Sequence, residues 1–296
     1  MTGVVLRRPR NLSQALEELA DEETLVLAGG QSLVLLMNTG LVVPERLVSI
    51  AELPELRGVQ AGDDGLDIGA LCTHRELAEH PVIRERMPAV ARMFDGVGNI
   101  RVRNAGTVGG NLVHADPAQD PPVMLAVLGA RATVVGPAGE RSLAVEDVAE
   151  GPFWPALEHD ELLTRVHVPW PGESDRTAYI KFLAGSHDDY ATVSVGARLT
   201  VDDGIVTSAR MAAGAVGPTV VVLDDAAEVL QGRAPDDSDA HHELGERVRD
   251  LVSPMPDRRG SADYKREMAG VVARRAVQAC LSGGAATGGR AQAAGG

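Results

Sequence analysis

The sequence predicts an α+β fold made of two α/β lobes and a C-terminal domain. Two short apolar runs, at 24–27 and 47–50, flank a helix-like stretch, which is typical of a small βαβ-like unit. Strand-like and helix-like stretches then mix until residues 169–172, where Pro-Trp-Pro-Gly indicates a linker. We expect an N-terminal lobe at 1–53, a second lobe at 54–172, a C-terminal domain with a small antiparallel sheet and helices at 173–282, and a disordered Gly/Ala-rich tail at 283–296.

Local signals place the elements within these parts. Ser13 is expected to cap a helix over 14–20. The strand at 24–27 should end at Gly29 and Gly30, with a helix resuming over 32–37. In the second lobe we expect strands at 66–68, 107–112, 132–135 and 163–168, and helical stretches at 76–94 and 120–128.

A hairpin signal opens the C-terminal domain. Asp202, Asp203 and Gly204 separate two apolar runs at 191–201 and 205–215, and such residues favour the positive φ values of a tight hairpin turn. After the hairpin we expect three helices, at 224–231, 241–252 and 262–281.

Composition excludes several classes of protein. The net charge of −14 leaves no basic surplus to neutralise phosphates, so no nucleic-acid partner is expected. Cys72 and Cys280 cannot supply an iron–sulfur cluster or a closed zinc site, so we expect reduced thiols and no metal. No apolar run approaches the ~18 residues of a membrane span, and residues 1–8 do not read as a signal peptide. These features favour a cytoplasmic protein.

Two glycine pairs are the main candidates for ligand binding. Gly29 and Gly30 follow an apolar strand and precede a helix, and Gly109 and Gly110, followed by Asn111, show the same layout. Glycine lets successive backbone N–H groups approach a pyrophosphate closely, and a following helix adds its positive dipole end. Either pair alone is more often an ordinary turn, but together they indicate a dinucleotide site.

Other chemical motifs are incomplete or absent. Gly-Val-Gly at 96–98 lacks the third glycine of the Rossmann fingerprint, and no P-loop, G-x-S-x-G or H-E-x-x-H is present. His241 and His242 are adjacent and would point to different helix faces, so a solvated surface is expected rather than a metal site. The aspartate pairs at 188–189 and 236–237 are expected in turns or on the surface.

The second glycine pair lies in a longer motif. Residues 100–112 read Ile-Arg-Val-Arg-Asn-Ala-Gly-Thr-Val-Gly-Gly-Asn-Leu, and Asp-Pro-Pro follows at 120–122. This run resembles the signature of the FAD-binding medium subunits of molybdenum hydroxylases, such as aerobic carbon monoxide dehydrogenase and xanthine dehydrogenase. Residues 28–32 are similar to the other FAD loop of that family, and residues 257–265 resemble the start of its last helix.

The resemblance implies the vanillyl-alcohol-oxidase (PCMH-type) FAD-binding fold, in which two lobes hold FAD and a C-terminal domain covers the flavin. It implies that the two loops bind the pyrophosphate, that Asp120 anchors the ribose or adenine side, that Val97 and Leu163 give apolar contacts, and that Thr73 donates near the diphosphate. The implied cofactor-binding residues are Leu27, Ala28, Gly29, Gly30, Gln31, Ser32, Leu33, Thr73, Val97, Thr107, Val108, Gly109, Gly110, Asn111, Asp120, Leu163, Lys181 and Tyr190.

Two residues of the C-terminal domain are implied to lie at the flavin ring. Lys181 matches a lysine that the family places there, where a cation would stabilise the anionic reduced flavin; the alternative is a solvated strand lysine. Tyr190 matches an aromatic position that can lie over the isoalloxazine; the alternative is ordinary packing. Residues 182–189 lack the family's arginine and carry His187 and Asp188 in its neighbourhood, which leaves the electron acceptor open. The flavin itself would supply the catalysis.

The function implied is that of an oxidoreductase subunit. A small iron–sulfur subunit and a large molybdenum-cofactor subunit would deliver electrons to the FAD, which would pass them to NAD or another acceptor. A stand-alone FAD-dependent oxidoreductase acting on a small molecule is one alternative, motivated by the altered segment 182–189. A scaffold that keeps the fold but not FAD is the other, and the intact glycine loops argue against it.

Overall fold

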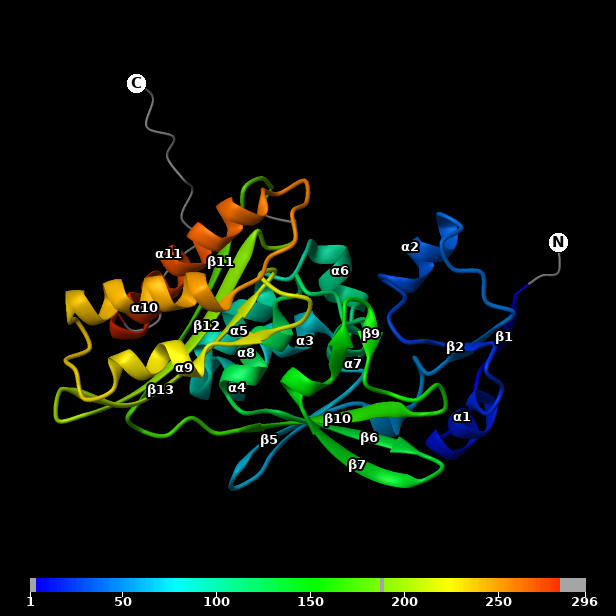
Figure 1. Cartoon of the computed structure of the whole chain (residues 1–296). Helices are drawn as coiled ribbons and strands as arrows, with labels where there is room; N and C mark the ends of the chain where they lie inside the picture. Colours follow the sequence, from blue (N-terminus) through cyan, green and yellow to red (C-terminus); the bar gives the residue numbers. More distant parts are fainter. Residues whose placement is uncertain (1–3, 187–188, 283–296) are drawn as a thin grey trace.

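The computed structural model describes residues 4–186 and 189–282 of the chain. Within them the chain forms a three-stranded, a five-stranded, a four-stranded and a two-stranded sheet, and helices pack beside them (Figure 1). The predicted α+β class is confirmed, and each of these sheets lies inside one of the three segments expected from the sequence. His187, Asp188 and the expected tail at 283–296 lie outside the described residues.

The first lobe is a parallel sheet of order β1-β3-β2. The strand predicted at 24–27 is present, and the one predicted at 47–50 is shifted by one residue. Helix α1 is capped by Asn11 and not by Ser13, because Asn11 has an extended backbone and its side chain accepts a hydrogen bond from the N–H of Gln14. The elements are β1 (Val5–Arg7), α1 (Leu12–Leu19), β2 (Thr24–Leu27), α2 (Leu33–Asn38) and β3 (Arg46–Ser49).

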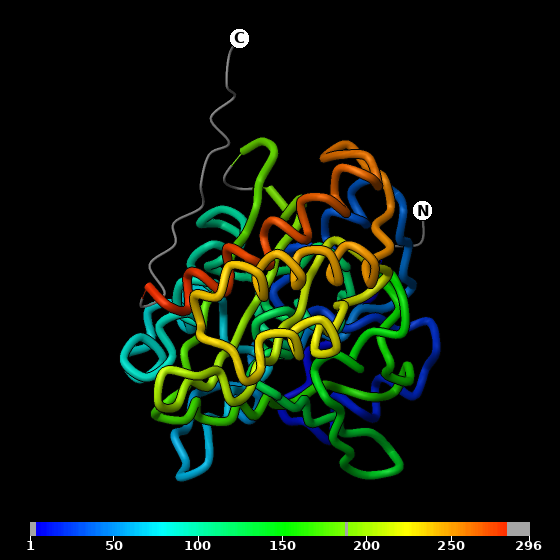
Figure 2. The backbone as a smooth tube through the Cα atoms, turned by 60° about the vertical axis from the view of Figure 1, so that its left-hand side comes forward, coloured from blue at the N-terminus to red at the C-terminus, as the bar shows by residue number. Residues whose placement is uncertain are grey.

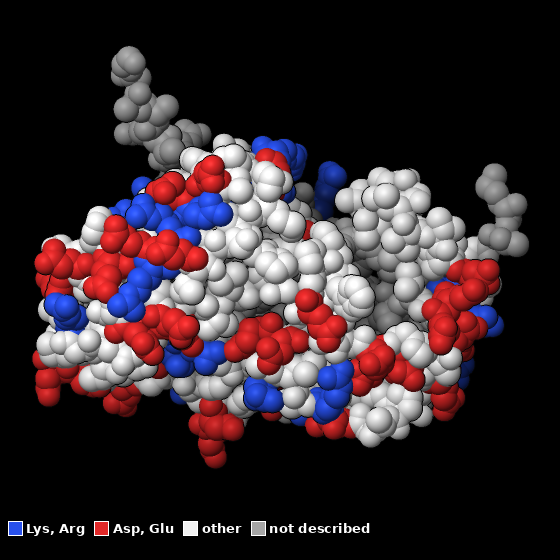
Figure 3. All heavy atoms as spheres, viewed as in Figure 1, with Lys and Arg blue, Asp and Glu red and all other residues white. Residues whose placement is uncertain are grey.

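Helix α2 has no buried residue, although Asn38 is its only polar one. Leu35 is 62% exposed, and the segment after the helix exposes Leu41 and Val43 at 75% and 81%. Figure 3 shows this part of the first lobe as a projection that carries no charged side chain on the face in view. Exposed apolar surface of this kind is typical of an interaction site.

The second lobe is an antiparallel sheet of order β4-β5-β10-β6-β7 with helices packed against it. Its buried core includes Phe94 and Met93 of α5 and Leu66 and Ile68 of β5. The elements are β4 (Val59–Ala61), β5 (Gly65–Gly69), α3 (His74–Glu79), α4 (Pro81–Arg86), α5 (Pro88–Asp95), α6 (Ile100–Ala105), α7 (Val108–His114), α8 (Pro121–Val127), β6 (Arg131–Gly136), β7 (Gly139–Ala144), β8 (Ala149–Gly151), β9 (Trp154–Pro155) and β10 (Leu162–Pro169).

The strand predicted at 107–112 is wrong, because helix α7 occupies this segment. Thr107 caps the helix, its hydroxyl accepting a hydrogen bond from the N–H of Gly110. Gly109 lets the helix pack tightly, since a Cβ there would lie only 2.6 Å from the Cβ of Ala70. A cap and a close packing contact therefore override the β-propensity of the Thr-Val pair.

The C-terminal domain is an antiparallel sheet of order β11-β12-β13-β14. The predicted hairpin is confirmed: Asp203 and Gly204 have φ values of 49° and 78° between its two long strands. Figure 2 shows α10 and α11 lying across the strands. The elements are β11 (Asp175–Phe182), β12 (Val193–Asp202), β13 (Ile205–Gly214), β14 (Val221–Val222), α9 (Asp224–Ala227), α10 (Ser238–Leu251) and α11 (Ala262–Leu281).

Helix α8 joins the second lobe to the C-terminal sheet. Met124 lies in the core of the second lobe, whereas Val123 and Val127 form a buried cluster with Ala212 of β13. A Cβ added to Gly196 of β12 would lie 3.1 Å from the side chain of Val127, so the helix approaches the sheet closely. Asp120, directly before α8, is therefore held at this junction.

Both cysteines are buried free thiols, as predicted. His242 is exposed, but the prediction for His241 is wrong: it is buried, and its Nε2 bonds to the carbonyl of Pro235. One of two adjacent helix residues faces the core, because consecutive side chains diverge. In the described ranges no cluster suited to a metal ion occurs, and none of their helices has the length and apolarity needed to cross a membrane.

Candidate functional site

The first glycine loop, residues 28–32, connects β2 to α2 and presents free donors. Among the described residues, no acceptor bonds to the backbone N–H groups of Gly29, Gly30, Gln31 and Ser32. Gly30 has a φ of +71°, the conformation in which successive N–H groups turn to one side of the chain. This loop can therefore bind an anion through its backbone.

The second glycine loop differs from the first, although the sequence predicts the same layout for both. The N–H of Val108 donates to Cys72, that of Gly109 to Ala70, and those of Gly110 and Asn111 to Thr107. Neither glycine of this pair has a positive φ, because both lie in α7. Backbone donors are thus already used here, and the expectation of a second anion nest is wrong.

The side chain of Asn111 is a polar group of the second loop that can still bind a ligand. Its Oδ1 is buried, and no described residue is its hydrogen-bond partner. A buried amide oxygen without a hydrogen-bond donor destabilises the folded protein. A ligand that donates a hydroxyl or N–H hydrogen to this oxygen would therefore stabilise it.

The two loops come from different lobes and lie against each other. A Cβ on Gly29 would lie 1.8 Å from the carbonyl oxygen of Ala105, directly before the second loop. A Cβ on Gly110 would lie 3.8 Å from the Cβ of Ala28. The free donors of the first loop therefore lie beside the start of α7 in the second loop.

Three of the implied residues have structural roles. The hydroxyl of Thr73 accepts from the N–H of Glu76 and donates to its carboxylate, which forms a capping box on α3 and leaves no hydrogen for a phosphate. Val97 and Leu163 are 7% and 4% exposed and belong to the core of the second lobe.

Lys181 and Asp120 form a buried ion pair at the junction described above. The Nζ of Lys181 lies 2.7 Å from Oδ2 of Asp120 and also donates to the carbonyl of Gly96 at 3.1 Å. Their side chains are only 11% and 6% exposed, so the alternative of a solvated lysine is wrong. The hydroxyl of Tyr179 donates to Oδ1 of Asp120 at 2.5 Å. Burial raises the pKa of the Asp120 carboxyl, and the cation of Lys181 opposes that rise.

The Lys181–Asp120 pair conflicts with the separate roles implied for its two residues. The resemblance assigns Asp120 to the ribose or adenine side and Lys181 to the flavin ring, at two ends of an extended dinucleotide. Because the two side chains share an ion pair, they face the same part of any bound ligand. A direct bond from Asp120 to the adenine side is therefore hard to combine with a flavin-facing Lys181.

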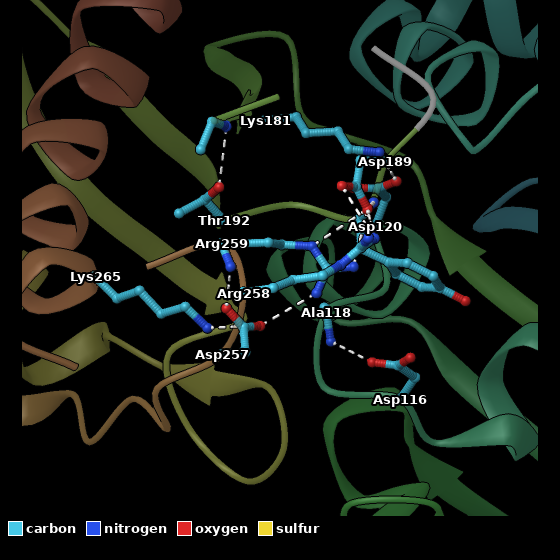
Figure 4. Close-up of polar contacts among 12 residues, drawn as sticks. Asp116, Ala118, Asp120, Lys181, Asp189, Thr192, Asp257, Arg258, Arg259 and Lys265 are labelled. Atoms are coloured by element: carbon cyan, nitrogen blue, oxygen red, sulfur yellow. Dashed lines mark hydrogen bonds and ion pairs between the residues drawn. The ribbon is translucent and has the colours of Figure 1, made fainter. Parts of the chain in front are cut away.

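A second ionic cluster, which the sequence does not predict, surrounds Asp189. Its carboxylate accepts hydrogen bonds from Arg258 and Arg259, about 70 residues farther along the chain (Figure 4). The guanidinium carbon of Arg259 lies 5.3 Å from the centre of the Tyr190 ring. Burial raises the pKa of the Tyr190 phenol, and the charges of Asp116, Asp120 and Asp189 add to the rise, while the Arg259 cation opposes it.

These features describe a protein of two lobes and a C-terminal domain with an anion-binding loop between the lobes, and comparison with known proteins identifies its family. Residues 3–171 match the model of the FAD binding domain in molybdopterin dehydrogenase, and residues 178–280 match the CO dehydrogenase flavoprotein C-terminal domain. The domain boundary expected at 172/173 falls between the two matches. The chain belongs to the family of FAD-binding subunits of molybdenum hydroxylase-type complexes.

Relatives and solved structures agree with this assignment. The chain is 33% identical over 275 residues to the carbon monoxide dehydrogenase medium chain of Afipia carboxidovorans, covering 92% of this chain and 94% of the relative. It is 27% identical over 288 residues to the xanthine dehydrogenase FAD-binding subunit of Escherichia coli O157:H7, covering 96% and 97%.

Among solved structures, reconstituted CO dehydrogenase from Oligotropha carboxidovorans superposes with a TM-score of 0.91 at 31% identity, covering 95% of this chain and 98% of that chain. Quinoline 2-oxidoreductase from Pseudomonas putida 86 gives 0.89 at 30% identity, with the same coverage. The expected fold is confirmed, and the chain is an FAD-binding oxidoreductase subunit.

Replacing Gly110 with valine should abolish FAD retention without unfolding the protein. A Cβ at this position would lie 2.9 Å from Oγ1 of Thr107 and 3.8 Å from the Cβ of Ala28, so the valine methyl groups would crowd the contact between the two loops. Gly62→Val in the exposed β4–β5 turn is the matched control, since a Cβ there meets nothing closer than 3.4 Å. The flavin-to-protein absorbance ratio after gel filtration measures the effect, and stoichiometric FAD in Gly110→Val would contradict the placement of the loop.

Breaking the Lys181–Asp120 pair from one side should destabilise the protein strongly. Lys181→Met leaves a buried carboxylate without its cation, a change that costs about 3–5 kcal/mol. Adding Asp120→Asn removes that charge and should recover most of the loss. Urea unfolding of the two single variants and the double variant gives the coupling; strictly additive losses would show that the two side chains do not interact.

His74 should make the protein less stable at acidic pH. It is buried beside the second loop, donates its backbone N–H to Gly106, and stacks on Phe94, and burial lowers its pKa from 6.5 to about 4. His74 takes up a proton at higher pH in the unfolded chain than in the folded protein. Its contribution to the free energy of unfolding is therefore fully present above pH 6.5 and decreases by about 3 kcal/mol as the pH falls to 4.

His74→Leu should reduce the slope of the free energy of unfolding against pH between pH 6.5 and 4, whatever it does to stability at neutral pH. Unfolding by urea at several pH values measures it. An unchanged slope between those two pH values would show that His74 is not the titrating group.

Proposed function

We propose that this chain accepts electrons from an iron–sulfur partner subunit and passes them, through FAD, to NAD or another small acceptor. The buried Lys181–Asp120 pair carries the proposal, because it fixes a cation where the C-terminal domain meets the second lobe. Bound FAD supplies reversible exchange of one or two electrons. A cation held beside the flavin ring would favour its reduced, anionic form, and so would help the subunit to take electrons up.

The chain's own residues supply little other redox chemistry. Burial raises the pKa of the Cys280 thiol to about 12 and also raises the pKa of Cys72 above its usual value. Both thiols therefore stay protonated at neutral pH, and a protonated thiol is a poor ligand and a poor nucleophile. Electrons must then enter from a substrate or from another protein.

The surface of the first lobe supports a protein donor. Leu35, Leu41 and Val43 form an exposed apolar projection around α2, next to the loop that would bind the pyrophosphate. A partner subunit docked on this projection would bury these side chains and lie close to the cofactor. The exposed donors of residues 29–32 would meanwhile hold the diphosphate.

An anaerobic titration with NADH tests the acceptor side of the proposal. When NADH is added to the flavoprotein in complex with its co-purifying subunits, the visible absorption of the flavin should bleach, because hydride transfer to FAD is reversible. If NADH leaves the flavin oxidised while a reduced quinone or dye bleaches it, NAD is excluded as the acceptor.

Co-purification tests the donor side. An affinity tag on this chain should recover iron–sulfur and molybdenum subunits from the native organism. If the chain purifies alone and a small organic substrate bleaches its flavin without any partner, the stand-alone oxidoreductase is correct instead.

A further inference from the structure

We propose that Arg259 is a positioning residue that holds the Tyr190 ring at the flavin site. This inference rests on the proposed placement of Tyr190 near the flavin and extends it to a residue outside the implied cofactor-binding set. Its basis is a continuous chain of hydrogen bonds and ion pairs that runs from helix α11 to Tyr190.

The guanidinium of Arg259 is fixed from two sides. Nη2 and Nε donate to Oδ1 of Asp189 at 2.9 and 3.3 Å, and Nη1 donates to Oδ2 of Asp257 at 3.1 Å. The side chain is only 16% exposed. Because the guanidinium is planar and its donors are arranged as a fork, two carboxylates on opposite sides set both its position and its tilt.

Asp257 is itself anchored to helix α11. The side chain of Lys265 is only 4% exposed. Its Nζ lies 3.0 Å from Oδ2 of Asp257 and also donates a hydrogen bond to the carbonyl of Met255. The backbone N–H of Arg259 donates to the other carboxylate oxygen of Asp257 at 2.8 Å. The position of the arginine is therefore tied to a twenty-residue helix and not to a free loop.

The same arrangement fixes Tyr190 at its backbone and at its ring. The N–H of Tyr190 donates to Oδ1 of Asp189 at 2.7 Å, the oxygen that Arg259 also binds. The Arg259 cation faces the ring at 5.3 Å from its centre, within the range of a cation–π interaction. Tyr190 is 40% exposed, so its ring is not fixed by complete burial.

Arg258 offers a matched control. It shares the Asp189 carboxylate at 3.1 Å, but its side chain is 75% exposed, and the structure records no contact between it and a described aromatic ring (Figure 4). A role that depended only on neutralising Asp189 would belong to both arginines. A role that depends on the ring belongs to Arg259 alone.

Flavin fluorescence of the purified holo-subunit, in complex with its partners where these remain bound, tests the inference. A tyrosine ring against a flavin quenches its emission, so Tyr190→Leu should brighten the bound flavin. Arg259→Gln should raise the emission toward that level, because losing the cation–π contact lowers the ratio of Tyr190 rings held at the flavin to rings released from it about fivefold. Arg258→Gln should leave the emission unchanged, and Arg259→Lys, which keeps the charge without the fork, should fall between.

The double variant Tyr190→Leu with Arg259→Gln gives the decisive result. If Arg259 acts through Tyr190, the double variant should emit like Tyr190→Leu alone. The inference is overturned if Arg259→Gln and Arg259→Lys lower thermal stability but leave the emission of the bound flavin unchanged, since that shows only a structural clamp. If Tyr190→Leu itself has no effect, both the inference and the placement of Tyr190 are wrong, while the NADH and co-purification results stand independently.

Discussion

The buried ion pair between Lys181 and Asp120 is the constraint on which the arrangement of the domains depends. Lys181 and Tyr179 are two residues apart on β11, so they lie on one face of the strand and both reach the carboxylate that precedes α8. Neither charge can be left alone at such low exposure, because an unpaired buried ion costs several kcal/mol. The C-terminal sheet is thereby held against the second lobe, and the ammonium group remains at the junction of the two.

In the proposed diphosphate site the two glycine loops would have different roles. The second loop is rigid, because its N–H groups are bonded to Ala70, Cys72 and Thr107 before any ligand arrives. The first loop keeps its donors free and belongs to a small lobe with a short parallel sheet. Binding of the cofactor would therefore fasten the first lobe to the second, and the folded protein should be more stable with FAD than without it.

The sequence predicts the elements whose signal is local and misses those decided by distant contacts. The β12–β13 hairpin and helix α11 follow from turn residues and periodicity, and both are found. The segment 107–112 reads as a strand because Thr and Val favour strands, but Thr107 caps a helix packed on Ala70. For the site, the glycine pairs were visible in the sequence. The Asp120–Lys181 pair, and the bonds from Asp189 to Arg259, join residues 61 and 70 positions apart, which no periodicity reveals.

In the proposed function, electrons would enter and leave at two separate surfaces of the chain. The apolar projection around α2 belongs to the first lobe, whereas Tyr190 and the arginines that bind Asp189 belong to the C-terminal domain. A partner docked on the first lobe would leave the C-terminal face open to a small acceptor. If Arg259 holds Tyr190 in place there, the access of an acceptor to the flavin would depend on contacts that begin in α11, far along the chain from the loops proposed to bind the cofactor.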